Sequence, residues 1–272
     1  MDLLKFIERN SDPRVTDWPL MGSPLQIIAI VVSYIAFVKV VGPSHMKDRK
    51  PYRIKELIIA YNILMVIANG WFVVVVARNT YFGGGYSFFC ERVDSGTETQ
   101  QRTVLTASYV FMFTKIIELL DTVFFVLTKK NSNISRLHVI HHSVISVTVW
   151  AVVNFGGASG QNVMFSLING TIHFIMYAYY AMAALGMHRY LWWKRYLTQL
   201  QMAQFIFLSF HSSIPVFKDC GFPPVWGYVT ILQTSLFFGL FFNFYLKTYK
   251  DKISAVAGGG KKIDQPQAMK IS

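Results

Sequence analysis

The chain has 272 residues, of which 53% are hydrophobic and 15% are charged, whereas soluble domains carry about 25% charged residues. This composition excludes an ordinary soluble domain. The formal net charge of +12 would suit nucleic-acid binding, but Lys and Arg also gather on the cytoplasmic side of membrane proteins.

The apolar residues gather in long blocks along the chain. A helix that crosses a bilayer needs about 20 consecutive apolar residues. The blocks predict an all-α polytopic membrane protein with seven transmembrane helices, at 25–42, 57–77, 104–128, 138–154, 163–185, 197–216 and 225–246. Charges recur through the first twenty residues, so no signal peptide is expected there. We therefore expect a luminal segment at 1–24, a membrane domain at 25–250 and a disordered cytosolic tail at 251–272.

The basic residues divide unequally between the two sides of these predicted spans. When alternate connections are assigned to opposite sides, one side holds 18 Lys and Arg residues, the other holds 7, and Lys115 lies inside a span. The positive-inside rule then predicts a luminal N-terminus and a cytosolic C-terminus. Because this rule explains the net charge, no nucleic-acid partner is expected.

The two cysteines, Cys90 and Cys220, follow the second and the sixth block and fall on the less basic side. That side is oxidising if the membrane belongs to the secretory pathway, so we expect a disulfide between the two loops, with two unpaired thiols as the alternative. No cysteine lies within a span, which excludes an intramembrane thiolate nucleophile.

The third block contains the run KIIELLDT, with Lys115, Glu118, Asp121 and Thr122. At 100° per residue, Lys115, Glu118 and Thr122 fall within about 60° of one another, and Asp121 adjoins them. A charge at the centre of a span costs roughly 2.5–3.5 kcal/mol. We expect a polar face toward the bundle interior; the alternative is neutralisation of Lys115 by Glu118 near the membrane surface.

The fourth block begins with LHVIHH, which places His138, His141 and His142 on one helical face. This cluster has two functional interpretations, a metal site and acid–base or nucleophilic chemistry. The structural alternative is a group of interfacial histidines that bind lipid headgroups.

The fifth and sixth blocks carry further polar residues. In the fifth, one stripe within about 100° contains Asn169, His173, Met176, Tyr177 and Tyr180. An intramembrane His and Asn need polar partners, whereas the Met and Tyr residues can serve packing alone. In the sixth, Thr198, Gln201 and Gln204 recur every third residue and suit either substrate contact or interhelical hydrogen bonds; His211 is expected to be structural.

Two protein classes are disfavoured by the motifs. Membrane di-iron enzymes need about eight histidines in several boxes, whereas this chain has seven histidines and one complete box. A seven-span receptor has no need for the polar runs, and its usual motifs are absent from the third and seventh blocks. A zinc site at His138, His142 and His173 stays open. The predicted topology opens the polar site toward the cytosol and closes it toward the lumen.

In combination, KIIELLDT, LHVIHH, NGTIHFIMYAYY and TQLQMAQ resemble, over about 20–250, the ELO family of very-long-chain fatty acid elongases. The resemblance implies a 3-oxoacyl-CoA synthase of the endoplasmic reticulum membrane, with spans two to seven forming a six-helix barrel around an acyl tunnel. The expected disulfide agrees with the family pattern. The resemblance implies partners in the reductases and dehydratase of an elongation cycle, and it leaves a homodimer open.

Such an enzyme would condense a long-chain acyl-CoA with the co-substrate malonyl-CoA in the surrounding membrane lipid, with no cofactor. Without a cysteine in the bundle, a histidine is the natural nucleophile, and His141 is the candidate. The other catalytic candidates are His138, His142, His173, Lys115, Glu118, Asp121 and Asn169. Substrate-binding candidates are Thr122, Tyr177, Tyr180, Thr198, Gln201 and Gln204, with Arg189, Lys194, Arg195 and Lys247 for the CoA phosphates. The alternatives are a zinc-dependent membrane lipid hydrolase and a non-enzymatic seven-span lipid-binding protein.

Overall fold

The computed structural model describes residues 7, 9–93 and 95–250, and all regular secondary structure in this part of the chain is helical. The longer elements are α2 (Pro24–Ala36), α3 (Gly42–Met46), α4 (Lys55–Asn79), α5 (Glu98–Ile117), α6 (Leu119–Leu127), α7 (Arg136–Asn154), α8 (Val163–Ala184), α9 (Lys194–Phe217) and α10 (Pro224–Tyr245). A π-helical turn, Phe37–Val41, joins α2 to α3. The predicted tail 251–272 lies outside the described residues.

The all-helical prediction is confirmed. Within the described residues, four helical stretches are long and apolar enough to cross a membrane: Pro24–Met46, Lys55–Asn79, Arg136–Asn154 and Pro224–Tyr249. The helices α5, α6, α8 and α9 occupy the other predicted ranges and are not among these four. The count of seven spans therefore stays a prediction.

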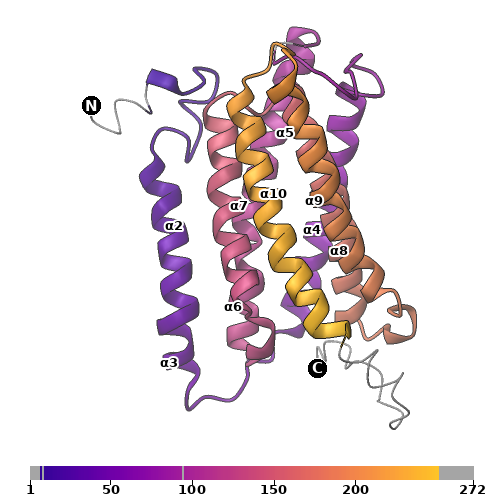
Figure 1. Ribbon diagram of the computed structural model, residues 1–272. Helices are drawn as coiled ribbons and strands as arrows, with labels where there is room; N and C mark the ends of the chain where they lie inside the picture. Colours follow the sequence, from indigo (N-terminus) through magenta and orange to yellow (C-terminus); the bar gives the residue numbers. More distant parts are fainter. Residues whose placement is uncertain (1–6, 8, 94, 251–272) are drawn as a thin grey trace.

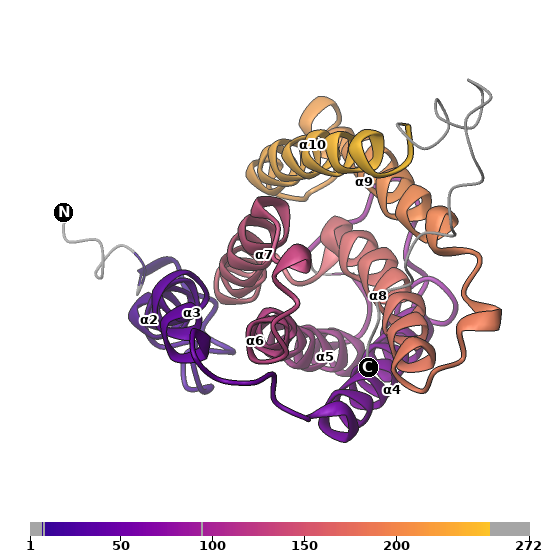
Figure 2. The ribbon, with the colours of Figure 1, turned by 90° about the horizontal axis from the view of Figure 1, so that it is seen from below.

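The helices pack side by side along a common direction (Figure 1). α4 contacts α5 and α8, α5 contacts α7, α7 contacts α10, α10 contacts α9, and α9 contacts α8. α2 lies outside these six neighbours, against α7, and α3 lies against α6 (Figure 2). The connections 47–54, 128–135 and 185–193 meet at one end of the molecule, which we call the basic end.

Two glycines bring α4 and α8 close together. A Cβ on Gly70 would lie 3.2 Å from the Phe174 ring, and one on Gly170 would lie 3.0 Å from the Phe72 ring. Each helix therefore inserts an aromatic ring where the other lacks a side chain. This reciprocal packing gives the pair its long contact and fixes the register of α8, which carries His173.

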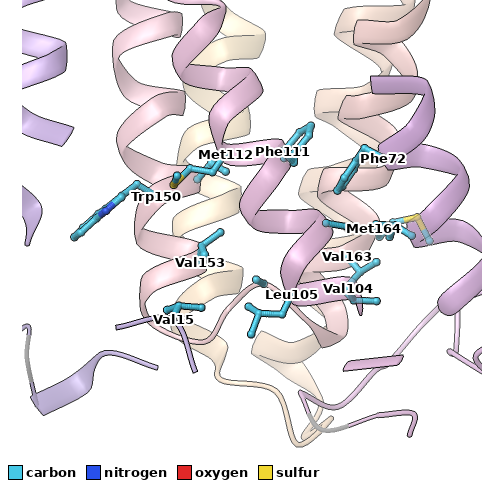
Figure 3. Packing of buried hydrophobic residues seen from close by; sticks show 14 of the residues in the cluster. Val15, Phe72, Val104, Leu105, Phe111, Met112, Trp150, Val153, Val163 and Met164 are labelled. Carbon is cyan, nitrogen blue, oxygen red and sulfur yellow. The ribbon is translucent and has the colours of Figure 1, made fainter. Parts of the chain in front are cut away.

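A large apolar core fills the half of the bundle away from the basic end. Side chains from α4, α5, α7 and α8 pack there, among them Phe72, Phe111, Val153 and Met164 (Figure 3), and α2 and α9 contribute to the same cluster. The Phe72 and Phe111 rings stack with centroids 4.4 Å apart. The N-terminal segment adds Val15 to the same core, so this half is densely filled.

A disulfide joins Cys90, in the loop after α4, to Cys220, in the loop after α9, with the two Cα atoms 5.4 Å apart. We call this end of the molecule the disulfide end. His211 lies beside it, where its Nε2 donates to the Phe88 carbonyl oxygen at 3.0 Å. His211 thus has the structural environment that the sequence suggested.

Removal of the disulfide is expected to destabilise the fold. Replacing both Cys90 and Cys220 with serine should lower the free energy of unfolding by about 2–4 kcal/mol, because the cross-link restricts the unfolded chain. Thermal unfolding of the detergent-solubilised protein measures the change. A reductant should lower the midpoint of the unmodified chain and leave the double variant unchanged; equal midpoints for both proteins without reductant would contradict the prediction.

Candidate active site

The helix that carries KIIELLDT is interrupted at Glu118, between α5 and α6. The Asp121 amide donates to the Glu118 carbonyl oxygen at 3.1 Å, a bond that spans three residues rather than four. Such a turn advances about 120° per residue instead of 100°. It moves Asp121 toward the direction of Glu118 and rotates Thr122 away from it.

The prediction that Thr122 shares the polar face of Lys115 and Glu118 is therefore wrong. Its hydroxyl lies 2.8 Å from the Tyr34 hydroxyl of α2, on the outer side of α6. Asp121, which the helical wheel placed beside the polar face, joins that face, because it accepts a hydrogen bond from Tyr177 of α8. The tightened turn thus exchanges the roles expected of these two neighbours.

Lys115 and Glu118 form an ion pair in which both side chains are fully buried. Lys115 Nζ lies 2.8 Å from Glu118 Oε1, and His173 Nδ1 lies 2.9 Å from the same oxygen. When Nδ1 donates its proton to Glu118, the lone pair of the ring is on Nε2. Lys115 Nζ also lies 3.1 Å from His173 Nδ1. Lys115 and Glu118 together therefore hold the His173 ring in its orientation.

Asp121 is held by a second buried group. The Tyr177 hydroxyl donates to Asp121 Oδ2 at 2.7 Å, and the Tyr61 hydroxyl lies 3.4 Å from that of Tyr177. Tyr177 does not line the cavity described below; it holds a residue that does. His173 and Tyr177, one helical turn apart on α8, thus contact Glu118 and Asp121, which are three residues apart.

The three histidines of LHVIHH lie together on the first turns of α7. Ser135 caps the helix, since its Oγ accepts from the His138 amide at 3.1 Å. The ring centroids of His138 and His142 are 4.3 Å apart, and those of His141 and His142 are 5.6 Å apart. The His141 ring packs against Phe237 of α10, with centroids 4.4 Å apart.

All three of these histidines, together with His173 and Asp121, line one cavity of about 250 Å³. Three buried nitrogens, His138 Nε2, His141 Nδ1 and His142 Nδ1, have no hydrogen-bond partner among the described residues. Buried polar atoms normally have a partner. At the wall of a shared cavity, these nitrogens are free to hydrogen-bond polar atoms that enter it.

The remaining walls divide into an apolar part and a polar part. Aromatic rings of Phe124, Phe205 and Phe241 face the cavity from three helices. The polar candidates Tyr180, Thr198, Gln201, Gln204 and Lys194 also line it. The cavity reaches the connection between α6 and α7 at Lys130 and Ser132, so it extends to the basic end.

Other predicted site residues lie away from the cavity lining. Asn169 is buried, and its Oδ1 has no partner within the described part of the chain. Arg189 and Lys247 are exposed. Arg195 is exposed as well, and its Nε donates to the Tyr245 hydroxyl at 2.8 Å. The structure therefore offers no contact of these four side chains with the cavity.

The donor atoms are not arranged as a metal site in the part of the chain that the structure describes. There, no group of three or more His, Cys, Asp and Glu side chains has a geometry that could hold a metal ion. The zinc alternative at His138, His142 and His173 thus has no ligand cluster to support it.

Sequence reasoning missed several residues of the cavity. Tyr61 and Asn62 of α4 line it, and a polar pair inside the second apolar block was the signal that could have found them. Lys130, Ser132 and Asn133 line it from the loop before α7. No motif marks these loop residues, because their position depends on how that connection folds.

Comparison with known proteins agrees with the motifs. Residues 19–256 match the sequence model of the ELO family, which is described as the GNS1/SUR4 family. A very long chain fatty acid elongase of Aedes aegypti is 37% identical over 90% of this chain and 69% of its own length. Very long chain fatty acid elongase 7 of Drosophila melanogaster is 39% identical over 93% of this chain and 79% of its own. Very long chain fatty acid elongase 4 of Homo sapiens is 38% identical over 91% of this chain and 79% of its own length. The resemblance expected from the motifs is confirmed, and the chain belongs to the ELO family.

Proposed function

We propose that this chain is the condensing enzyme of very-long-chain fatty acid elongation. It joins a long-chain acyl-CoA to malonyl-CoA and releases 3-oxoacyl-CoA, CO2 and CoA. The proposed setting is the endoplasmic reticulum membrane, with seven spans, a luminal N-terminus and a cytosolic C-terminus. Spans two to seven would surround the acyl chain as a barrel, which agrees with the order of contacts among α4, α5, α7, α10, α9 and α8.

One observation carries this proposal: four histidines and a carboxylate line a cavity whose other walls have both an aromatic, apolar part and a polar part. An acyl thioester has both kinds of surface, a polar reacting end and a hydrocarbon chain. A site that only binds lipid does not require three partnerless imidazole nitrogens at its wall. The described cysteines are joined in a disulfide away from this cavity, which favours an imidazole as the nucleophile.

In the first proposed step, an imidazole nitrogen of His141 attacks the carbonyl carbon of the acyl-CoA. The bond from carbon to sulfur breaks, and the CoA thiolate takes the imidazole proton as it leaves. Malonyl-CoA then loses CO2, and the electrons of the broken carbon–carbon bond form an enolate. The enolate carbon attacks the acyl-imidazole, the bond from carbon to nitrogen breaks, and the imidazole regains a proton from solvent.

The neighbouring groups would orient and stabilise these steps. His173, held by Glu118, presents Nε2 as a proton acceptor or donor. His138 and His142 would hydrogen-bond the enolate oxygen or the malonyl carboxylate. Lys115 stabilises the charge on Glu118 and does not line the cavity. Asn169 has no place in this scheme, because it does not reach the cavity.

An elongation assay tests the proposal. Microsomes that contain the chain receive a panel of saturated and polyunsaturated acyl-CoAs with labelled malonyl-CoA. We expect labelled products two carbons longer than at least one substrate. Products absent across the whole panel, from protein shown to be folded by its thermal transition, would contradict the proposal and favour a lipid-binding protein.

Lys194 and Arg195 allow a matched test of how CoA is bound. Lys194 lines the cavity, whereas Arg195 contacts Tyr245. Lys194→Gln should raise the Michaelis constant for malonyl-CoA about ten-fold, as expected for the loss of one charge-assisted contact with a phosphate. Arg195→Gln should leave it within about two-fold. If both variants keep the Michaelis constant of the unmodified chain, neither cation binds CoA, and the positive-inside rule alone explains the two residues.

A further inference from the structure

The outer helix α2 and the π-helical turn after it contact α6 along one face. Leu119 packs in an apolar cluster with Tyr34, Val38 and Val139. Thr122 and Val126 follow Leu119 at helical spacing, so the three form the outer face of α6. A Cβ on Gly42 would lie 2.7 Å from Val126 Cγ1, which shows how closely the chain after α2 approaches that face. Figure 2 shows α2 and α3 outside the other helices, beside α6 and α7.

A polar contact lies within this apolar surface. The Tyr34 hydroxyl is 2.8 Å from Thr122 Oγ1, and both side chains are buried, although the residues are 88 positions apart. A buried hydroxyl without a partner costs about 1–3 kcal/mol. Any rotation of α6 that separates the two hydroxyls carries this cost, so the contact favours one rotational setting of the helix.

The inner face of the same short helix carries the site. Asp121 is the neighbour of Thr122, accepts from the Tyr177 hydroxyl and lines the cavity. Phe124 lines the same cavity. α6 has nine residues and follows the tightened turn at Glu118. A tyrosine on each side, Tyr34 outside and Tyr177 inside, therefore determines how α6 presents Asp121 to the cavity.

We propose that Tyr34 is a positioning residue for the elongation reaction, acting through Thr122 on Asp121. This inference rests on the proposed function for its kinetic test, but its structural part does not. α2 then contributes to catalysis without touching the cavity. The bond needs both hydroxyls, so the two residues should behave as one unit when either is changed.

The test uses substitutions that remove only a hydroxyl or retain it. Tyr34→Phe and Thr122→Val should each lower kcat about five-fold, the loss expected from one hydrogen bond, with little change in KM. The double variant should lose no more than either single variant. Thr122→Ser should keep nearly full activity. The control is Tyr109→Phe, which removes a hydroxyl contact of α5 with the Pro19 carbonyl oxygen in the turn before α2, ten residues before α6 begins.

Amide hydrogen exchange over 118–127 provides a readout that needs no activity. Exchange there should be faster in Tyr34→Phe and Thr122→Val than in Tyr109→Phe or the unmodified chain. Unchanged exchange in both α6-directed variants would overturn the inference. So would a kcat for Tyr34→Phe equal to that of Tyr109→Phe, or losses that multiply in the double variant. If the unmodified chain shows no elongation activity but exchange over 118–127 is faster in the variants, the proposed function is contradicted. The coupling of α2 to α6 is then still supported.

Discussion

Replacement of His141 by alanine is expected to lower the rate of elongation about a thousand-fold, within the range of about 10²–10⁴ typical for a lost acid–base or nucleophilic group. His141 lines the cavity beside His142 and packs on Phe237. Its removal takes away the proposed acyl acceptor and leaves the Lys115–Glu118 pair intact. Initial rates of two-carbon extension, measured at equal amounts of folded protein, check the result.

A matched control is available in His188, an exposed histidine in the short helix before α9. His188→Ala makes the same chemical change outside the cavity and should retain the full rate. A rate for His141→Ala within about three-fold of that control would show that His141 has no chemical role. The nucleophile would then have to be sought among His138, His142 and His173.

Replacement of Glu118 by glutamine is expected to destabilise the protein by about 3–5 kcal/mol, the usual cost of removing one partner from a buried ion pair. Lys115 is fully buried, and the Glu118 carboxylate is its partner at 2.8 Å. The same change removes the carboxylate that fixes His173, so elongation should be lost as well. Thermal unfolding in detergent measures the first effect and the elongation assay measures the second.

Glu56→Gln is the control for this experiment, because Glu56 is exposed in the first turn of α4. It should shift the unfolding midpoint very little. The double variant Lys115→Met, Glu118→Leu should recover much of the stability, since apolar residues often replace a buried ion pair without loss. It should not recover elongation. A Glu118→Gln protein as stable as the Glu56→Gln protein would contradict the prediction.

The helices could be predicted from the sequence because apolar blocks must form helices in a bilayer. The block at 57–77 became α4, Lys55–Asn79, with only small changes at its ends. The block predicted at 104–128 begins six residues after the helix that it belongs to. α5 begins at Glu98, because Thr97 and Gln100 form a capping box and a polar turn precedes the apolar residues. Hydropathy does not detect such a turn.

The site was predictable where the backbone is regular. On α7 and α8, standard helical spacing brings His138, His141, His142 and His173 to one cavity. The same reasoning failed for Thr122, because one three-residue hydrogen bond at Glu118 rotates the helix that follows. Tyr34 and Tyr61 were also missed. Each lies in an apolar block, and although Asn62 beside Tyr61 marks a polar pair there, the role of each tyrosine depends on which helix it packs against.

A covalent adduct tests the central claim most directly. The purified chain is incubated with a long-chain acyl-CoA in the absence of malonyl-CoA, and peptides are mapped by mass spectrometry. We expect an acyl group on the peptide that contains His141, its loss on addition of malonyl-CoA, and no adduct in His141→Ala. An adduct that persists in His141→Ala, or an elongating protein that never acquires one, would contradict the acyl-imidazole mechanism.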